Sequence, residues 1–195
     1  MTNALAQRLS RLANWKVILS LVVLVIVFNR LLFLPRTARL VDLSGIQEPI
    51  IDVLFSYSPQ AVYAIVAGLG DQGRQIYIVT QLTVDLVFPI LYSLLLALLI
   101  FTIFRKAFAG AGFLQKAIWL PLIGALFDYG ENFGIVAMLV AHPNQPALLA
   151  QVTSLFSSAK WVTLLLAVGL FLFGLAVWIS KGIRKPQSAL KAKGP

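Results

Sequence analysis

The sequence has no cysteine, one histidine and only seven acidic residues among 195. Without cysteine the chain can form no disulfide, zinc–thiolate site, iron–sulfur cluster or cysteine nucleophile. With His142 alone, it can form neither a haem site with two histidine ligands nor a zinc site rich in histidine. Charged residues make up 12% of the chain, against about 25% in soluble domains. These shortages exclude an ordinary soluble or nucleic-acid-binding domain, and we expect no cofactor and no metal.

Hydrophobic residues are the excess, at 59% of the chain and a mean hydropathy of +0.89. A helix that crosses a bilayer needs about 20 mostly apolar residues, and it satisfies its own backbone hydrogen bonds. Four runs are long enough: residues 16–34, 77–104, 117–141 and 158–179. We predict an all-α fold, a four-helix transmembrane bundle that forms a single domain over residues 1–180. A basic tail, 181–195, is expected to be cytoplasmic, disordered and attracted to membrane lipid rather than to nucleic acid.

The distribution of basic residues predicts the orientation of these spans. Eleven Lys and Arg residues fall on the side that holds both ends of the chain. Three fall on the other side, namely Arg36, Arg39 and Arg74. Because short cytoplasmic loops are enriched in Lys and Arg, both termini are predicted to be cytoplasmic, in a multi-pass protein of the bacterial inner membrane.

The loop between the first two spans, residues 36–76, is too long to lack structure. Within it, Ser58 and Pro59 have the residue types of a helix N-cap and first helical position. Apolar residues then recur at helical spacing, and 71–74 are expected to turn into the second span. We predict a short extracytoplasmic helix that either lies on the membrane face, filling space, or caps a site in the bundle.

Three of the seven acids fall inside predicted spans: Asp85, Asp128 and Glu131. Charges at membrane depth are costly, so they usually face the bundle interior and find partners there. Helical spacing places further polar residues on the same faces, and the fourth span adds one cation. We predict a polar, ligand-binding pocket in the outer half of the bundle, formed by Gln81, Asp85, Tyr92, Asp128, Glu131, Asn132 and Lys160.

The charges of this set do not balance. Three carboxyls face at most two nearby cations, Lys160 and Arg30. Either one carboxyl stays protonated or a bound cation compensates for it. The alternative is that the polar groups only hold the helices together, at about 1 kcal/mol each. A carboxylate-only site for a hard cation is a further alternative, but few other oxygen ligands are available to complete it.

Gly130 and Gly134 form a small-residue pair in the third span. Such pairs allow two helices to approach closely. The third span is therefore expected either at the centre of the bundle or at the seam of a homo-oligomer.

Five parts of the sequence form a recognisable set: 70–74, Tyr77, Asp85 to Pro89, Tyr92 and 127–132. In this set the chain resembles a group of uncharacterised four-span bacterial integral membrane proteins. Asp85 and Pro89 also resemble the acid and proline in the second span of the EXPERA proteins, which include emopamil-binding sterol isomerases. That resemblance implies a lipid-sized pocket in which Asp85 would pair with a cationic ligand or intermediate. The 127–132 motif and the long outer loop depart from the EXPERA pattern.

These observations lead to one leading function and three alternatives. The leading hypothesis is non-covalent binding of a small amphipathic or cationic ligand in the carboxylate-lined pocket. The alternatives are a proton-linked transporter that works as an oligomer, an EXPERA-like lipid isomerase, and an accessory or assembly subunit of a membrane complex. No catalytic residue can be assigned, because no nucleophile with an adjacent base can be identified.

Overall fold

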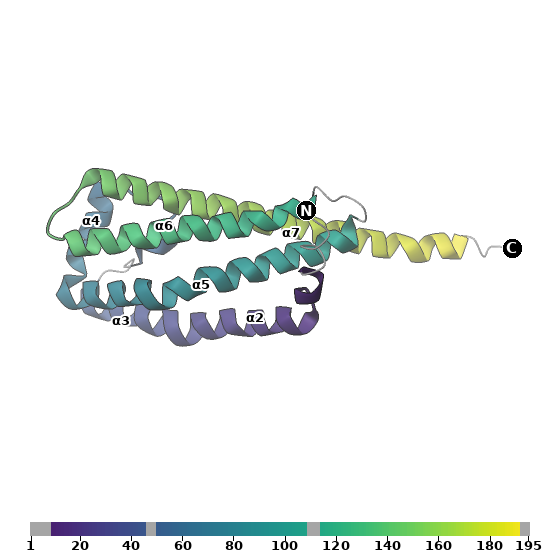
Figure 1. Cartoon of the computed structure of the whole chain (residues 1–195), viewed down its shortest axis with the longest axis horizontal. Helices are drawn as coiled ribbons and strands as arrows, with labels where there is room; N and C mark the ends of the chain where they lie inside the picture. The colour runs from purple at the N-terminus through teal and green to yellow at the C-terminus, as the bar shows by residue number, and fades with distance from the viewer. Residues whose placement is uncertain (1–8, 46–49, 109–113, 192–195) are drawn as a thin grey trace.

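The computed structural model describes residues 9–45, 50–108 and 114–191, which are helical with no strand. Four of the helices are long and apolar enough to cross a membrane, which indicates a multi-pass membrane protein. The first is continuous from Trp15 to Ser44, and the chain then forms a short 3₁₀ turn and a small helix before the other three (Figure 1). The elements are α2 (Trp15–Val27), η1 (Phe28–Phe33), α3 (Leu34–Ser44), η2 (Ile51–Val53), α4 (Pro59–Gly68), α5 (Gly70–Ala107), η3 (Leu114–Ile118), α6 (Trp119–Ala141) and α7 (Ala147–Lys191).

The first helix runs ten residues beyond its predicted end at Leu34. Proline interrupts a helix because it has no N–H and its ring collides with the carbonyl four residues earlier. Here a π-helical turn, η1, comes just before Pro35, and the amide of Leu34 bonds to the carbonyl of Asn29, five residues back. Pro35 therefore lies in the first turn of α3, where proline is tolerated. The helix ends at Gly45, whose φ of 65° requires a left-handed conformation.

The second long helix begins at Gly70, seven residues before its predicted start. Residues 71–74, expected to form a turn, are helical, and the turn is made one residue earlier by Gly70, with a φ of 62°. Asp71 lies in the first helical turn, where a negative charge is favourable, and it pairs with Arg74. The small helix before it, α4, begins where Ser58 accepts a hydrogen bond from the amide of Ala61.

The last helix, α7, is longer at both ends than the predicted span of 158–179. It begins at Ala147, eleven residues before the predicted start. It continues to Lys191, so the tail predicted to be disordered is helical to that residue. Residues 192–195 of the tail, and Arg8 among the cations used for orientation, lie outside the described residues.

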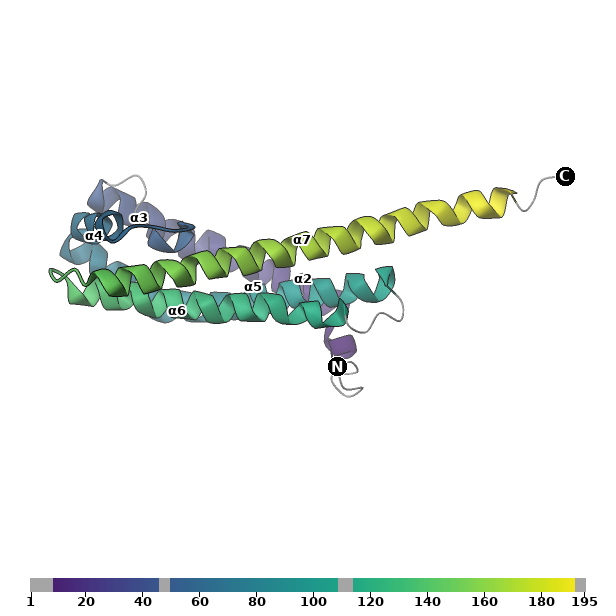
Figure 2. The ribbon, with the colours of Figure 1, turned by 90° about the horizontal axis from the view of Figure 1, so that it is seen from above.

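Helices α5, α6 and α7 pack on one another, and the first long helix packs mainly on α5 (Figures 1 and 2). A Cβ added at Gly134 would collide with Thr153 of α7, and one added at Gly130 would lie 2.9 Å from Phe156. The glycine pair therefore allows α6 and α7 to approach within one chain. Of the long helices, α5 contacts all the others, whereas the third span, α6, packs mainly on α5 and α7.

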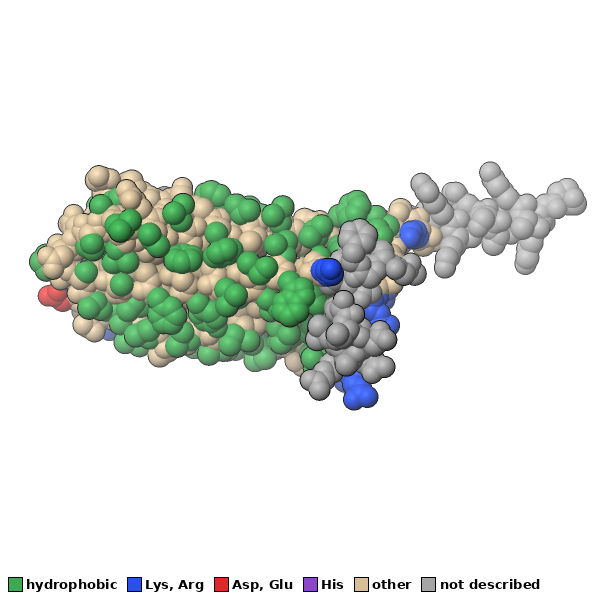
Figure 3. All heavy atoms as spheres, turned by 45° about the horizontal axis from the view of Figure 1, so that its top comes forward, with side chains coloured by type: hydrophobic (Ala, Val, Ile, Leu, Met, Phe, Trp, Pro, Cys, Tyr) green, Lys and Arg blue, Asp and Glu red, His purple; other side chains and the backbone are tan. Residues whose placement is uncertain are grey.

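Two apolar clusters occupy the ends of the bundle. One, the cap cluster, joins α3, η2 and α4 to the tops of α5, α6 and α7, and includes Ile51, Val62, Val66, Ile135 and Met138. The other, the base cluster, lies toward the opposite end, and includes Ile100, Phe101, Phe104, Ile118 and Ala167. Lys and Arg side chains gather at that opposite end, where α7 leaves the bundle (Figure 3). A layer of polar side chains lies between the two clusters.

Candidate functional site

The polar layer contains all seven residues predicted to form the site. Six of them are buried, and Tyr92 is partly buried. Helix α5 contributes Gln81, Asp85 and Tyr92, α6 contributes Asp128, Glu131 and Asn132, and α7 contributes Lys160. Helical spacing thus identified residues that three separate helices bring into one layer.

Lys160 is the centre of an ion-pair network. Its Nζ lies 2.5 Å from Oε2 of Glu131 and 3.4 Å from Oδ1 of Asp128, and it donates to the backbone carbonyl of Asp52 at 2.7 Å. The second oxygen of Asp128 accepts a hydrogen bond from the hydroxyl of Tyr92 at 2.7 Å. Lys160 and Glu131 are almost completely buried, with 6% and 0% of their side chains exposed. The charge of Lys160 is therefore already matched within the protein.

Asn132 links α6 to a gap in the hydrogen bonds of α5. In a regular helix, the carbonyl of Asp85 would accept from the amide of residue 89, but Pro89 has no N–H. Nδ2 of Asn132 donates to this carbonyl at 3.2 Å. The hydroxyl of Tyr129 donates to the next carbonyl, that of Leu86, at 2.7 Å. Asn132 therefore supports the backbone that presents Asp85, while the Asp85 carboxyl is left to face the pocket.

Asp52, in η2, is a fourth carboxyl that sequence reasoning missed. The cap folds back over the polar layer, and Oδ1 of Asp52 accepts from the hydroxyl of Tyr77 at 2.9 Å. That hydroxyl also accepts from the amide of Ile51 at 2.8 Å, which fixes the position of η2. The signal in the sequence is an acid between two apolar pairs, Ile50-Ile51 and Val53-Leu54.

Serine hydroxyls of α7 attach the segment after η2, residues 54–57, to that helix. Ser157 donates to the carbonyl of Leu54 at 2.5 Å, and Ser158 donates to that of Phe55 at 3.0 Å. Oγ of Ser154 accepts from the amide of Tyr57 at 2.9 Å. Three serines of α7 therefore hold this segment in place.

The hydroxyl of Tyr57 lies at the edge of this layer. Burial raises its pKa well above the usual value, and the negative charge of Glu131 raises it further. The hydroxyl is therefore neutral and retains its proton for donation. Together with both amide atoms of Gln81, it is buried with no hydrogen-bond partner in the described part of the chain.

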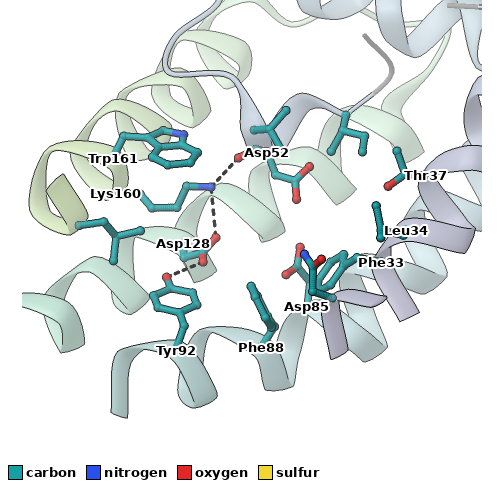
Figure 4. Close-up of a pocket in the computed structure, with 14 residues that line it drawn as sticks. Phe33, Leu34, Thr37, Asp52, Asp85, Phe88, Tyr92, Asp128, Lys160 and Trp161 are labelled. Atoms are coloured by element: carbon teal, nitrogen blue, oxygen red, sulfur yellow. Dashed lines mark hydrogen bonds and ion pairs between the residues drawn. The ribbon is translucent and has the colours of Figure 1, made fainter. Parts of the chain in front are cut away.

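A pocket of about 460 Å³ opens beside this network, within the size range of small-molecule sites. The 3₁₀ turn η2 covers the pocket. One side is formed by η1 and α3, the other by α7, and α5 and α6 form the remaining wall. Figure 4 shows the carboxyls of Asp52 and Asp85 directed into the same space, with aromatic rings around it. The lining residues are Asn29, Phe33, Leu34, Thr37, Ile50, Asp52, Val53, Asp85, Phe88, Tyr92, Asp128, Lys160, Trp161 and Leu164.

Not every predicted residue lines the pocket. Gln81, Glu131 and Asn132 lie behind its wall, where Glu131 and Asn132 hold Lys160 and Asp85 in place. At the rim, Leu34 is 45% exposed and Val53 is 60% exposed. These exposed apolar residues at the edge show that the pocket opens on the side of the bundle.

The charge balance differs from the expected one. Arg30, counted as a second cation, is exposed and does not line the pocket. Among the residues that the structure describes, four carboxyls therefore meet one cation in the polar layer, and that cation pairs with Glu131 and Asp128. Asp52 and Asp85 form no ion pair with any described residue. No group of three or more His, Cys, Asp or Glu within the described ranges is arranged to hold a metal ion.

Comparisons with known proteins do not identify a function for this site. No family model matches the sequence, and neither the curated proteins nor the solved structures give a significant match. The resemblances drawn from the sequence therefore stay predictions, and the function has to be argued from the pocket.

Proposed function

We propose that this protein is a binding protein of the membrane, and that its pocket takes a small amphipathic or cationic ligand without covalent chemistry. The observation that carries the proposal is the pair of carboxyls, Asp52 and Asp85, that share one pocket and lack a cation of their own. A cationic group between them would supply the missing charge. An anionic ligand would instead add to an excess of negative charge.

The pocket walls support a cation of low hydration. Four aromatic side chains line the space, from Phe33, Phe88, Tyr92 and Trp161. The faces of aromatic rings attract cations, and quaternary ammonium groups are typically bound in this way. The combination of two acids and several rings therefore favours an organic ammonium group over a small hydrated metal ion.

We further propose that both termini are cytoplasmic and that the pocket lies in the outer half of the membrane. The concentration of Lys and Arg at the end near the base cluster supports this orientation. The loop that carries η2 and α4 would then be extracytoplasmic, and η2 would be the part of it that covers the site. The bacterial inner membrane is the location that the sequence pattern favours.

The packing favours binding over transport or a purely structural role. The cap cluster and the base cluster cover the polar layer from both ends of the bundle, whereas the pocket opens sideways. The pocket, which is lined by η1, α3, η2, α5, α6 and α7, is also larger than packing between helices requires. Proton-linked transport would require ligand-driven pH change in proteoliposomes that Glu131→Gln abolishes.

The test uses purified protein in dodecylmaltoside, with hexyltrimethylammonium as the cation and hexanoate as the matched anion. Unfolding temperature is followed by tryptophan fluorescence, because a ligand that binds only the folded state raises it. We expect the cation alone to raise it, and Asp52→Asn and Asp85→Asn each to reduce that shift. Asp42→Asn is the matched control, since Asp42 is exposed and outside the pocket.

Each ligand-induced shift is measured against the same variant without ligand, and the shift from the cation is compared with that from the anion in the same variant. Equal shifts from the cation and the anion would overturn the proposal. So would an undiminished shift in both Asp52→Asn and Asp85→Asn.

A further inference from the structure

A second hollow, of about 330 Å³, lies between α5 and α7 next to the pocket. Three residues line both spaces: Tyr92, Trp161 and Leu164. The remaining residues that line the hollow are all aliphatic: Leu95, Leu96, Leu99, Leu165 and Val168. The two spaces therefore adjoin, with the carboxyls in one and hydrocarbon in the other.

Polarity changes sharply where the two spaces meet. The hydroxyl of Tyr92 points into the polar pocket, where it donates to Asp128, so Tyr92 turns only its ring toward the hollow. From Tyr92 to Leu99, the hollow follows α5 for about 10 Å in the direction of the base cluster. We call this hollow the α5–α7 groove.

The distance from the basic end to the pocket indicates the depth at which the pocket would lie in a membrane. Asp85 is 20 residues from Arg105 on α5, and Lys160 is 21 residues from Lys181 on α7, which are about 30 Å along each helix. That distance equals the thickness of the hydrocarbon core. If the basic end lies at the cytoplasmic interface, the carboxyls lie at the outer one, and the groove runs from there toward the midplane.

We infer that the ligand is a cationic amphiphile taken from the outer leaflet, with its ammonium group between Asp52 and Asp85 and its hydrocarbon chain in the α5–α7 groove. The inference rests on the proposed function and extends it to the class of ligand and the orientation in which the ligand binds. An outer-leaflet amphiphile has its head at the interface and its chain toward the midplane, which is how the pocket and groove are arranged. The exposed rim at Leu34 and Val53 lets such a molecule enter sideways from the bilayer.

The hydrocarbon chain of the ligand sets the ligand's position and adds little to its affinity. Lipid tails are as apolar as leucine, so moving a chain from bilayer to groove gains little. Selectivity for charge should therefore come from the carboxyls, and the groove should fix the position of the hydrocarbon chain. The two contributions can be measured separately.

Trp161 lies where the pocket meets the groove, so its fluorescence responds directly to a hydrocarbon chain in the groove. Trp15, Trp119 and Trp178 are 69%, 50% and 41% exposed and would report contact with any detergent. In full-length protein with these three replaced by Phe, dodecyltrimethylammonium brominated at carbons 6 and 7 should quench Trp161 saturably. Unbrominated dodecyltrimethylammonium should reverse the quenching, and equally brominated dodecanoate should not produce it.

Val168→Phe fills the groove away from the carboxyls. The larger ring should occupy space that the hydrocarbon chain would take, and so weaken the apparent affinity for the brominated cation about fivefold or more. Val162→Phe is the matched control, because Val162 is exposed on the same helix but lines neither space. Hexyltrimethylammonium should stabilise the protein equally in both variants, because its short chain does not reach Val168.

Two failures can be told apart. If hexyltrimethylammonium stabilises the protein but Val168→Phe and Val162→Phe have the same affinity for the brominated cation, the groove assignment is overturned and the proposed function stands. If neither cation binds in preference to its anion, both are overturned. A change of oligomeric state in Val168→Phe without loss of quenching would assign the groove to a second copy of the chain instead.

Discussion

Replacing Lys160 by methionine removes the cation that holds the polar layer together. Lys160→Met keeps the length and apolar character of the side chain but leaves Glu131 and Asp128 facing each other without compensation. Lys160 Nζ is 2.5 Å from Glu131 and 3.4 Å from Asp128, and no part of the Glu131 side chain is exposed. The variant therefore isolates the charge from the packing.

The expected cost follows from this burial. Breaking a buried ion pair by removing one partner destabilises a protein by about 3–5 kcal/mol, because the other charge stays buried. Glu131→Gln should cost less, about 1.5–3 kcal/mol, because Lys160 keeps Asp128 and the carbonyl of Asp52. The double variant should be more stable than Lys160→Met alone, because it removes the orphaned carboxylate.

Unfolding in mixed micelles of dodecylmaltoside and dodecyl sulfate, followed by tryptophan fluorescence, would measure these free energies. Lys16→Met is the control, since Lys16 is exposed and should change stability by no more than about 0.5 kcal/mol. Two results would refute the reasoning. One is a Lys160→Met variant as stable as the parent, and the other is a double variant whose loss equals the sum of the single losses.

Two further predictions concern the helix contacts around the site. Asn132→Leu should lower the free energy of unfolding by about 1–3 kcal/mol, because the carbonyl of Asp85 loses its donor. The loss should shrink in a Pro89→Ala background, where residue 89 regains its N–H; an equal loss in both backgrounds would contradict this account. Gly134→Ala should lower the unfolding temperature by forcing α6 and α7 apart, whereas Gly169→Ala, with no atom within 4 Å of the added Cβ, should leave it unchanged or raise it. Equal unfolding temperatures for these two variants would show that the close approach at Gly134 is not needed.

Much of the site could be predicted because its signals are local to single helices. Asp85, Asp128 and Glu131 stand out as acids in long apolar runs, and helical periodicity gives the residues on their faces. Pro89 is also visible in the sequence, and it leaves the carbonyl of Asp85 without its helical N–H donor. Another side chain, here Asn132, has to supply that donor. Hydrophobic length alone was enough for four helices that can cross a membrane.

The rest depended on contacts between distant parts of the chain. Asp52 reaches the pocket only because Tyr77 and Lys160 hold η2 over the polar layer, and no periodicity reports such contacts. Ser154 and Ser157 of α7 bond to the segment after η2, and these contacts join residues 97 and 103 positions apart in the chain. Arg30 was counted with the site, but it is exposed and does not line the pocket.

The π-helical turn at η1 has a consequence for how the first helix can be altered. Each α-helical residue turns the chain by about 100°, and a turn with bonds five residues apart accommodates one extra residue without breaking the rod. The face of α2 that packs on α5 and the face of α3 that points to the cap are therefore related by a different rotation from the one a regular α-helix would give. Deleting a single residue between Phe28 and Phe33 would give a smoother and equally apolar helix. That helix would still enter a membrane, but one of its two halves would present the wrong side to its neighbours.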